Sequence, residues 1–539
     1  YTANTVVDFA GTLAQSVRIT ISAGYGLMPQ YGLSEVRFLY TPTFAMEPQP
    51  IDGSTTANGN VVLSWRSGRE AASSEVYLGT DAADLALLGT TSGNSLTATD
   101  VEYSTSYFWS VTEVNEAEAV TSYAGDLWSF TVPAAGVVDN FDLYDDYCNR
   151  IFFAWEDGLG HNGGEDIDGC DVPPSNGNGS GSILGNATAP FAEQTLVHSG
   201  RQSMPFSYEG NSEATVDVAN LAIGQDWTKG APSTLVLWVH GDLDNAATDA
   251  LYVKINNSKV MYDGDVSVPI WKQWNVNLAA SGANLSSVNT LAIGVEASGP
   301  GMLYLDDIAL YRVAPEVVEP PAGSDPSLVA HWKLDETAGL DVADSSGYGN
   351  NGTLIGMDGT EWTTGILGGA LELSGGSAGT PKYVEFDDVS SLQLSDSATI
   401  SAWVKMNEGN ADVYMGIAGK LTSGFYRGFA LVRHSSNVFR LWCDDGEGNL
   451  AGHDASSDNN YTDTEWHHLA GVMDDGTSIL YVDGVRQAQE GSIDLHDSGT
   501  YAHIGKQYSD ESSHRYWNGL VDDVRIYYRA LSEQEISDL

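Results

Sequence analysis

The stretch GLVDDVRIYYRAL, Gly519–Leu531, decides how this sequence is interpreted. An apolar residue, an acid and Val or Ile are followed by alternating residues that end in Tyr, as in a β-strand with one buried face. The same phrase occurs as LYLDDIALYRVAP from Leu303 and as GLSEVRFLYTP from Gly32. Three copies of one strand phrase predict that it closes three separate β domains.

The composition favours an all-β protein with several domains. The chain has 539 residues, which is too long for one hydrophobic core, and 42% of them are hydrophobic. Short runs rich in Val, Ile, Thr, Tyr and Trp are broken by Gly, Asn, Asp and Ser throughout the chain. We therefore expect tandem β-sandwich or jelly-roll domains joined by short Pro/Gly linkers.

The net charge excludes some classes of partner. The chain has 73 acids and 23 bases, a formal net charge of -50. Nucleic acids and anionic membranes both require a basic surface, so neither is an expected partner. No apolar run approaches the ~18–20 residues needed to cross a bilayer, so no membrane insertion is expected. Most acids should lie on a solvated surface, and a few should bind Ca²⁺, which prefers carboxylate and carbonyl oxygens.

The cysteines and the first residue bear on how the chain is cross-linked and processed. Cys148 and Cys170 flank a Gly-rich segment and are predicted to form a disulfide, whereas Cys443 in VFRLWCDD should be a buried apolar residue. The sequence begins with Tyr and shows no signal peptide, so we expect it to be processed or to be a piece of a longer protein.

Two resemblances cover the first quarter of the chain. Within residues 1–44, AQSVRITISAGYGLMPQYGLSEVRFLYTP resembles the last strands of a discoidin-like jelly roll, which would be incomplete here. Within residues 48–133, NVVLSWRSGREAASSEVYLGT and SLTATDVEYSTSYFWSVTEVNE resemble a fibronectin type III-like sandwich. Alternation in that segment predicts that Tyr107, Trp109 and Val111 share one buried face.

Two further resemblances cover the rest. Residues 137–313, with APFAEQTLVHSGRQSMPFSY, resemble a galactose-binding-like jelly roll of the carbohydrate-binding type, found in large surface and secreted proteins of bacteria such as planctomycetes. After a Pro-rich linker, residues 326–539 contain LVAHWKLDETAGLDVADSSGYGNNG and WHHLAGVMDDGTSILYVDGV and resemble a laminin-G-like (concanavalin A-like) jelly roll. Its final SEQEISDL predicts a short helix with Ser532 and Glu535 as a capping box.

The acids of the closing phrase raise a question of charge. Simple alternation puts Asp522 on one face with Leu520, Val524, Ile526 and Tyr528. An unpaired carboxylate in line with aliphatic core residues is costly to bury, so it needs either a cation or strong hydrogen-bond donors.

The cation alternative follows from resemblance to calcium-bearing laminarinase-type jelly rolls. In those proteins an Asp of the last strand binds a structural Ca²⁺ together with oxygens near the start of the domain. In residues 326–539 the implied ligands are Asp522 and Asp344, the latter in the loop DSSGYGNNG. In residues 137–313 they are Asp306, or alternatively Asp307, with Asp139, Asp142 and the HSGR turn. Hydrogen-bonded Asx turns are the alternative at each position.

No catalytic site is expected. The glucanases that share the concanavalin A-like fold use paired carboxylates, with a Glu-x-Asp-x-x-Glu strand signature. The nearest match has Glu385 and Asp387 but Ser390 in place of the second Glu. No His-Glu-x-x-His motif occurs.

The predicted function is therefore binding or adhesion outside the cell or at its surface, with a polysaccharide or surface glycan as partner. Candidate ligand contacts are the loop residues Tyr426, Arg427, Tyr508 and Trp517. One alternative is a structural subunit of an extracellular filament or surface layer, which would self-assemble through the incomplete first domain. Another is the accessory tail of a polysaccharide-degrading enzyme.

Overall fold

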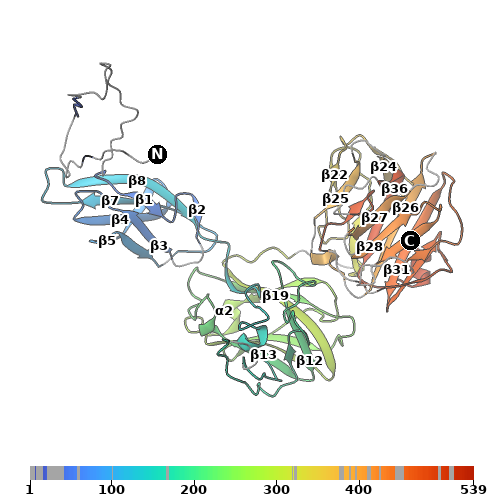
Figure 1. Cartoon of the computed structure of the whole chain (residues 1–539), viewed down its shortest axis with the longest axis horizontal. Helices are drawn as coiled ribbons and strands as arrows, with labels where there is room; N and C mark the ends of the chain where they lie inside the picture. The colour runs from blue at the N-terminus through green and yellow to red at the C-terminus, as the bar shows by residue number, and fades with distance from the viewer. Residues whose placement is uncertain are drawn as a thin grey trace, which may run out of the picture.

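The structure is a computed structural model dominated by β-strands. It describes residues 7, 16–20, 42–56, 61–99, 101–164, 169–317, 320, 324–375, 381–387, 390–394, 397–408, 414–423, 427–443, 454–493, 495, 499–508 and 515–539. The strands build three sandwiches that follow one another in chain order along the longest axis (Figure 1). We call them the N-terminal (46–131), middle (135–311) and C-terminal (328–539) sandwiches.

The N-terminal sandwich packs a sheet of order β1-β3-β6 against one of order β2-β8-β7-β4-β5. On β7, Tyr107, Trp109 and Val111 are buried and alternate with half-buried neighbours, as predicted. The strands are β1 (Met46–Gln49), β2 (Ser54–Thr55), β3 (Val61–Arg66), β4 (Ser73–Asp81), β5 (Asp84–Thr91), β6 (Ser95–Ala98), β7 (Ser106–Val114) and β8 (Ser122–Thr131).

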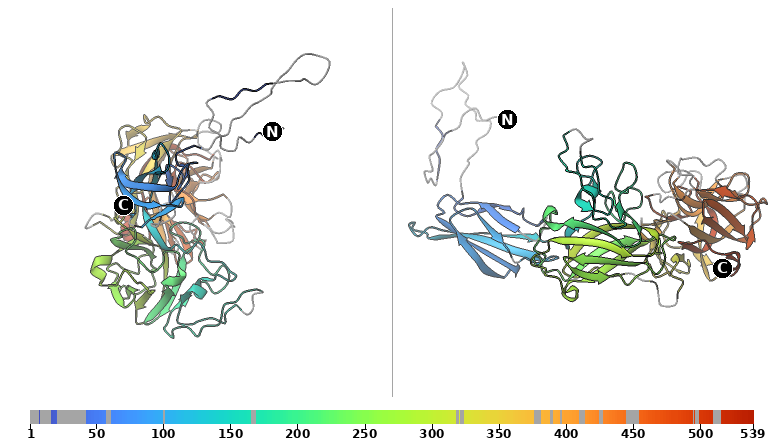
Figure 2. Two further views of the ribbon diagram at one scale, coloured as in Figure 1. Left: turned by 90° about the vertical axis from the view of Figure 1, so that its left-hand side faces the viewer. Right: turned by 90° about the horizontal axis from the view of Figure 1, so that it is seen from below.

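The middle sandwich pairs a sheet of order β10-β13-β18-β15-β16 with one of order β11-β12-β19-β14-β17, to which β9 is added beside β19. The segment between β9 and β12 rises from one side of it, in teal in the right-hand view of Figure 2. The elements are β9 (Ala135–Asp139), α1 (Ile151–Ala154), β10 (Trp155–Glu156), β11 (Ile183–Leu184), β12 (Met204–Glu209), β13 (Ser212–Asp217), β14 (Thr234–His240), β15 (Ala250–Ile255), β16 (Ser258–Met261), β17 (Trp271–Asn277), α2 (Leu278–Ser281), β18 (Thr290–Glu296) and β19 (Pro300–Tyr311).

The C-terminal sandwich pairs a sheet of order β23-β24-β36-β26-β31-β32-β33, with β20 added beside β36 and β34 beside β32, with one of order β21-β22-β25-β35-β27-β28-β29-β30. Its elements are β20 (Leu328–Trp332), β21 (Asp341–Val342), β22 (Gly352–Ile355), β23 (Trp362–Thr364), β24 (Gly369–Ser374), β25 (Tyr383–Phe386), β26 (Ala398–Met406), β27 (Met415–Leu421), β28 (Gly428–Arg433), β29 (Phe439–Cys443), β30 (Ala455–Ser456), β31 (Trp466–Asp474), β32 (Thr477–Val482), β33 (Val485–Arg486), β34 (Gly491–Ser492), β35 (His503–Ile504), β36 (Asn518–Tyr527) and α3 (Glu533–Ser537).

Several local predictions have a clear outcome. Cys443 is fully buried, and α3 carries the predicted capping box of Ser532 and Glu535. The predicted discoidin-like strands of residues 1–44 lie almost entirely outside the described residues. In the described part of the chain, no helix is long and apolar enough to cross a membrane.

Candidate binding site beside a closing strand

Both closing strands lie inside a sheet and change partner halfway along. On one side, β19 pairs first with β12 and then with β9, and β36 pairs first with β24 and then with β20. On the other side, the register slips by one residue within Asp306–Ala309 and within Asp522–Arg525. Asp307 and Asp523 adopt left-handed conformations, with φ of 46° and 47°. The two consecutive acids of each phrase therefore form a β-bulge at the point where the strand changes partner.

This bulge corrects the predicted faces of β36. Val521, Val524 and Ile526 belong to the same hydrophobic core, which strict alternation does not allow. The bulge inserts one residue, so Val521 and Val524 both point inward and Asp522 leaves the core face. Asp522 is buried instead under the turn that precedes β24.

Asp306 holds the turn that leads into β12. Its Oδ2 accepts hydrogen bonds from the backbone N–H of His198 at 3.0 Å and of Ser199 at 3.3 Å, and its Oδ1 accepts from the N–H of Asp307 at 2.8 Å. Burial, with the charge of Asp307, raises the pKa of Asp306 to about 8. Ca²⁺ is the expected link between Asp306 and the HSGR turn, whereas here direct hydrogen bonds join them.

Asp522 plays the same part for the turn before β24. Its Oδ2 accepts from the N–H of Ile366 at 2.8 Å and of Leu367 at 2.9 Å. Its Oδ1 is buried and has no hydrogen-bond partner among the described residues. Burial and the nearby carboxylates of Asp523 and Asp335 raise the pKa of Asp522. An orphaned carboxylate oxygen beside a second carboxylate is a reasonable fit to a cation such as Ca²⁺.

Asp344 does not share that environment. Its Oδ1 accepts from the N–H of His331 at 2.9 Å and of Ser346 at 2.8 Å, and its Oδ2 accepts from Ser346 Oγ and from the N–H of Asn350. Both oxygens therefore face donors. The hydrogen-bonded turn, which was the alternative to a calcium ligand, describes Asp344.

The predicted ligands near the start of the middle sandwich are also met by donors. Asp139 accepts from Tyr144 Oη at 2.6 Å, from Trp155 Nε1 at 2.9 Å and from the N–H of Phe141. Asp142 accepts from the N–H of Arg201 at 2.6 Å and from Asn140 Nδ2 at 3.1 Å. In the ranges that the structure describes, no group of three or more His, Cys, Asp or Glu could hold a metal.

The second acid of each bulge pairs with a histidine. His198 Nδ1 lies 2.6 Å from Asp307 Oδ2, and His331 Nε2 lies 2.8 Å from Asp523 Oδ1. Asp523 has a further partner, because the Arg525 guanidinium lies 2.9 Å from its Oδ2. Burial opposes ionisation of Asp523, but the His331 hydrogen bond and the Arg525 charge hold its pKa below the usual value.

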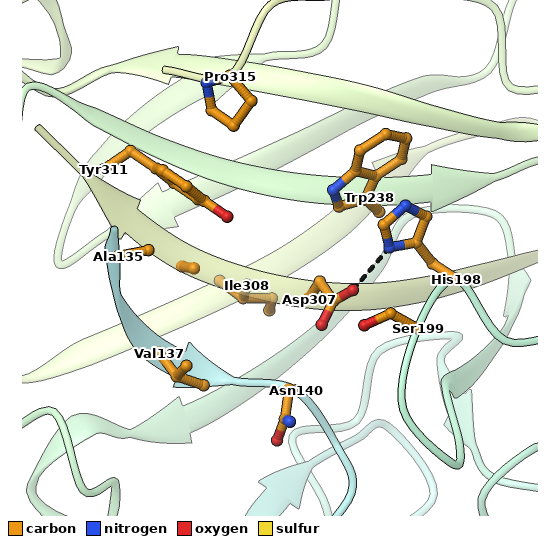
Figure 3. Close-up of a pocket in the computed structure, with 11 residues that line it drawn as sticks. Ala135, Val137, Asn140, His198, Ser199, Trp238, Asp307, Ile308, Tyr311 and Pro315 are labelled. Atoms are coloured by element: carbon orange, nitrogen blue, oxygen red, sulfur yellow. Dashed lines mark hydrogen bonds and ion pairs between the residues drawn. The ribbon is translucent and has the colours of Figure 1, made fainter. Parts of the chain in front are cut away.

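A pocket of about 410 Å³ opens on the outer side of the middle sandwich, beside Asp307 (Figure 3). The Tyr311 hydroxyl and the Asp307 carboxylate point into the same space, and the His198 ring stacks on Trp238 with centroids 3.7 Å apart. Burial and the Asp307 charge raise the pKa of Tyr311. The lining residues are Ala135, Val137, Asn140, His198, Ser199, Trp238, Asp307, Ile308, Ala309, Tyr311 and Pro315.

The predicted ligand contacts lie elsewhere, and two of them are corrected. Trp517 is fully buried, and its Nε1 donates to Leu520 O at 3.1 Å. Tyr508 is 4% exposed and packs near Trp442. Neither ring can offer a face to a ligand, because both fill the packing around the strand ends. Arg427 is half-buried, and Tyr426 lies outside the described residues.

The Cys148 and Cys170 side chains are neighbours in the segment between β9 and β12. Both are thiols in this structure, and a hydrogen bond between them is the main cause that raises the pKa of Cys148 to about 11. The disulfide between them stays a prediction.

The match to a protein family lies in the C-terminal sandwich. Residues 378–537, which span β25 to α3, match the model of the concanavalin A-like lectin/glucanases superfamily. A search of curated protein sequences finds no match. Among solved structures, domain 4 of AbnA, an extracellular arabinanase from Geobacillus stearothermophilus, in complex with arabinotriose, is 22% identical (39% of this chain, 97% of that chain, TM-score 0.30).

The binding domain of Paraclostridial Mosquitocidal Protein 1 is 15% identical (39% of this chain, 51% of that chain, TM-score 0.32). The receptor-binding domain of botulinum neurotoxin C/D mosaic serotype is 16% identical (39% and 50%, TM-score 0.30). The chain thus spans about half of these two toxin domains. On the match of the family model, residues 378–537 form a concanavalin A-like jelly-roll domain.

Proposed function

We propose that this chain is a non-catalytic extracellular binding protein that recognises glycans or other surface polymers through its sandwiches. The observation that carries the proposal is the pocket beside β19, where a tyrosine hydroxyl, a carboxylate and an indole meet. Binding sites for small ligands combine apolar walls with a few convergent polar groups in volumes of about 300–1,000 Å³. The pocket has this composition and this size.

The sugar chemistry follows from the pocket's walls. Trp238 and Pro315 offer apolar surface to the carbon-bound hydrogens of a sugar, while Tyr311, Asp307 and Asn140 offer hydrogen-bond partners for its hydroxyls. The scaffold is rigid at this point, because Asp307 is fixed by the bulge and by its bond to His198. A rigid polar site limits the entropy lost on binding.

Glycan-array binding of the purified chain tests this function. Tyr311→Phe removes one hydroxyl and keeps the ring, so it should weaken binding about three- to tenfold. Tyr147→Phe makes the same change at a side chain that is 69% exposed and is not among the lining residues, and it should have no effect. The proposal fails if the array shows no glycan binding, or if both variants bind like the parent chain.

Ca²⁺ at Asp522 is the proposed stabilising ion of the C-terminal sandwich. The buried Asp522 Oδ1, with Asp335 nearby, would supply carboxylate ligands. An ion that binds only the folded state stabilises it by mass action, about 2.7 kcal/mol at a hundredfold excess over Kd. Ca²⁺ should therefore raise the melting temperature of this sandwich, and EDTA should reverse the effect.

Two isosteric variants locate the ion. Asp522→Asn should abolish the response of the melting temperature to Ca²⁺. Asp344→Asn, a matched change at a carboxylate already met by donors, should preserve it. A calcium response that survives Asp522→Asn and disappears in Asp344→Asn would place the ion at the other loop.

A further inference from the structure

In the C-terminal sandwich, an arginine side chain fills the space beside the β-bulge of β36. Arg525 lies two residues after Asp523, on the outer side of β36, and its guanidinium pairs with the Asp523 carboxylate at 2.9 Å. The Asp523 charge and, after it, Tyr527, the next outward residue along the strand, raise the pKa of Arg525 against the effect of burial. The Asp523 carboxylate thus holds a cation on the outer face of the sheet, with Tyr527 next along the same face.

The middle sandwich has a carboxylate and a tyrosine at the corresponding positions, but no basic side chain between them. Counted from the bulge, Asp307 and Tyr311 occupy the positions of Asp523 and Tyr527, and Ala309 occupies that of Arg525. Ala309 and Arg525 each lie between two strands of corresponding position in their sheets. Ala309 pairs with Val236 of β14 and Val137 of β9, just as Arg525 pairs with Ser401 of β26 and His331 of β20. Ala309 is one of the residues that line the pocket, and its methyl group stands where the C-terminal sandwich has a long basic side chain.

The charges around this space suit a cation. His198 pairs with Asp307 Oδ2, and no described residue donates a hydrogen bond to Asp307 Oδ1. The residues that line the pocket include no Lys or Arg, and they include Trp238 with its indole ring. Aromatic rings attract cations, and a carboxylate near a pocket wall is a stronger partner for an ammonium group than for a neutral hydroxyl.

We propose that the pocket of the middle sandwich is a cation seat, and that its ligand is a polysaccharide with protonated amino sugars. This inference rests on the proposed glycan-binding function and specifies the class of glycan. An ammonium group would take the place that the Arg525 guanidinium holds in the C-terminal sandwich, between Asp307 and Tyr311. The pocket is wider than a guanidinium needs, and its apolar walls at Trp238, Val137 and Pro315 suit the ring of the sugar that bears the amine.

Calorimetric titration of the full chain with three oligomer series tests the class of ligand. Oligomers of glucosamine, N-acetylglucosamine and glucose with the same linkage and length differ at one substituent. At a pH where the amine is protonated, the glucosamine series should bind at least about tenfold more tightly than the other two, with an affinity that falls as salt rises. Equal or tighter binding of the neutral series would overturn the amino-sugar assignment.

Further outcomes distinguish a failure of the amino-sugar assignment from a failure of the proposed glycan-binding function. Binding of neutral glycans on the array, with no preference for amines, refutes the cation seat and leaves the glycan function standing. No binding of any glycan refutes both. Tight binding of an arginine-rich peptide without binding of glucosamine oligomers would overturn the polysaccharide in favour of a protein partner.

A pair of variants with the same chemical change locates the site. Ala309→Arg should fill the seat with a tethered guanidinium, as in the C-terminal sandwich, and reduce glucosamine-oligomer affinity at least tenfold. Ala219→Arg adds the same side chain at an exposed position of the same sandwich, outside the pocket lining, and should leave the affinity unchanged. Melting curves that match the parent chain show that both variants fold. Unchanged affinity in Ala309→Arg would remove the site from this pocket.

Discussion

The closing strands β19 and β36 share one sequence pattern and one β-bulge, but they differ in what lies beside the bulge. In each, the first acid anchors the turn that precedes a neighbouring strand, and the second takes a left-handed conformation and pairs with a histidine. The strands differ two residues later, at Ala309 and Arg525. That difference leaves a pocket on one sandwich and a filled ion pair on the other, so one side chain separates a candidate binding surface from a closed one.

The histidine partners show how little of this arrangement lies in the phrase itself. His198 comes from the turn before β12, whereas His331 comes from β20 and sits opposite Arg525 in the sheet. The two sandwiches supply an imidazole to the same carboxylate from different elements. The second acid of the bulge is shielded from water and needs a hydrogen-bond partner, and the element that supplies this partner differs between the two folds.

The largest expected effect concerns the first acid. Asp522→Ala should destabilise the C-terminal sandwich by about 2–3 kcal/mol, because the N–H groups of Ile366 and Leu367 lose their common acceptor. Differential scanning calorimetry of the full chain should show a lower melting transition for that sandwich alone. The matched Asp306→Ala should lower the transition of the middle sandwich instead. If neither transition moves, the acids do not hold the turns.

A smaller effect is expected at the ion pair of Arg525 with Asp523. Arg525→Ala leaves Asp523 with His331 as its side-chain partner and should cost about 1 kcal/mol, because the ion pair is only partly buried. Millimolar methylguanidinium should restore part of the lost melting temperature by entering the vacated place. The same compound should give no such gain to Arg66→Ala, whose guanidinium pairs with Glu47 at the surface. Equal responses of the two variants would show that no seat exists.

Asp306 should make the stability of the middle sandwich depend on pH. Its pKa is raised to about 8 in the folded chain, so the folded state holds a proton that the unfolded state releases near pH 4. The stability of the middle sandwich should fall as pH rises from about 4 to 8. Asp306→Asn, which cannot ionise, should flatten this part of the melting-temperature profile. A profile of the parent chain that rises over the same range would contradict the raised pKa.

Local patterns predict much of the fold. Alternation on β7, the capping box at Ser532 and the burial of Cys443 follow from short-range rules, and the closing phrase correctly marks the last strand of two sandwiches. The bulge does not follow from alternation, because one inserted residue reverses every face after it. For that reason the sequence places Asp522 in the core, whereas the structure places it under a turn.

The candidate site could not be assembled from the sequence by spacing. His198 and Asp307 are 109 residues apart, and Trp238 comes from a third segment. The sequence favours loop aromatics such as Trp517 as ligand contacts, but Trp517 is buried, because burial depends on tertiary packing. A usable signal does exist: aligning LDDIALY with VDDVRIY sets Ala309 against Arg525, and a missing basic residue in an otherwise repeated phrase marks the open position.

A crystal structure of the Ala309→Arg variant tests the central claim most directly. If the two closing strands build the same cation site, the introduced guanidinium should lie within hydrogen-bond distance of Asp307 Oδ1 and beside Tyr311, reproducing the ion pair of Arg525 with Asp523. A guanidinium that extends into solvent, with the pocket still open, would contradict the account.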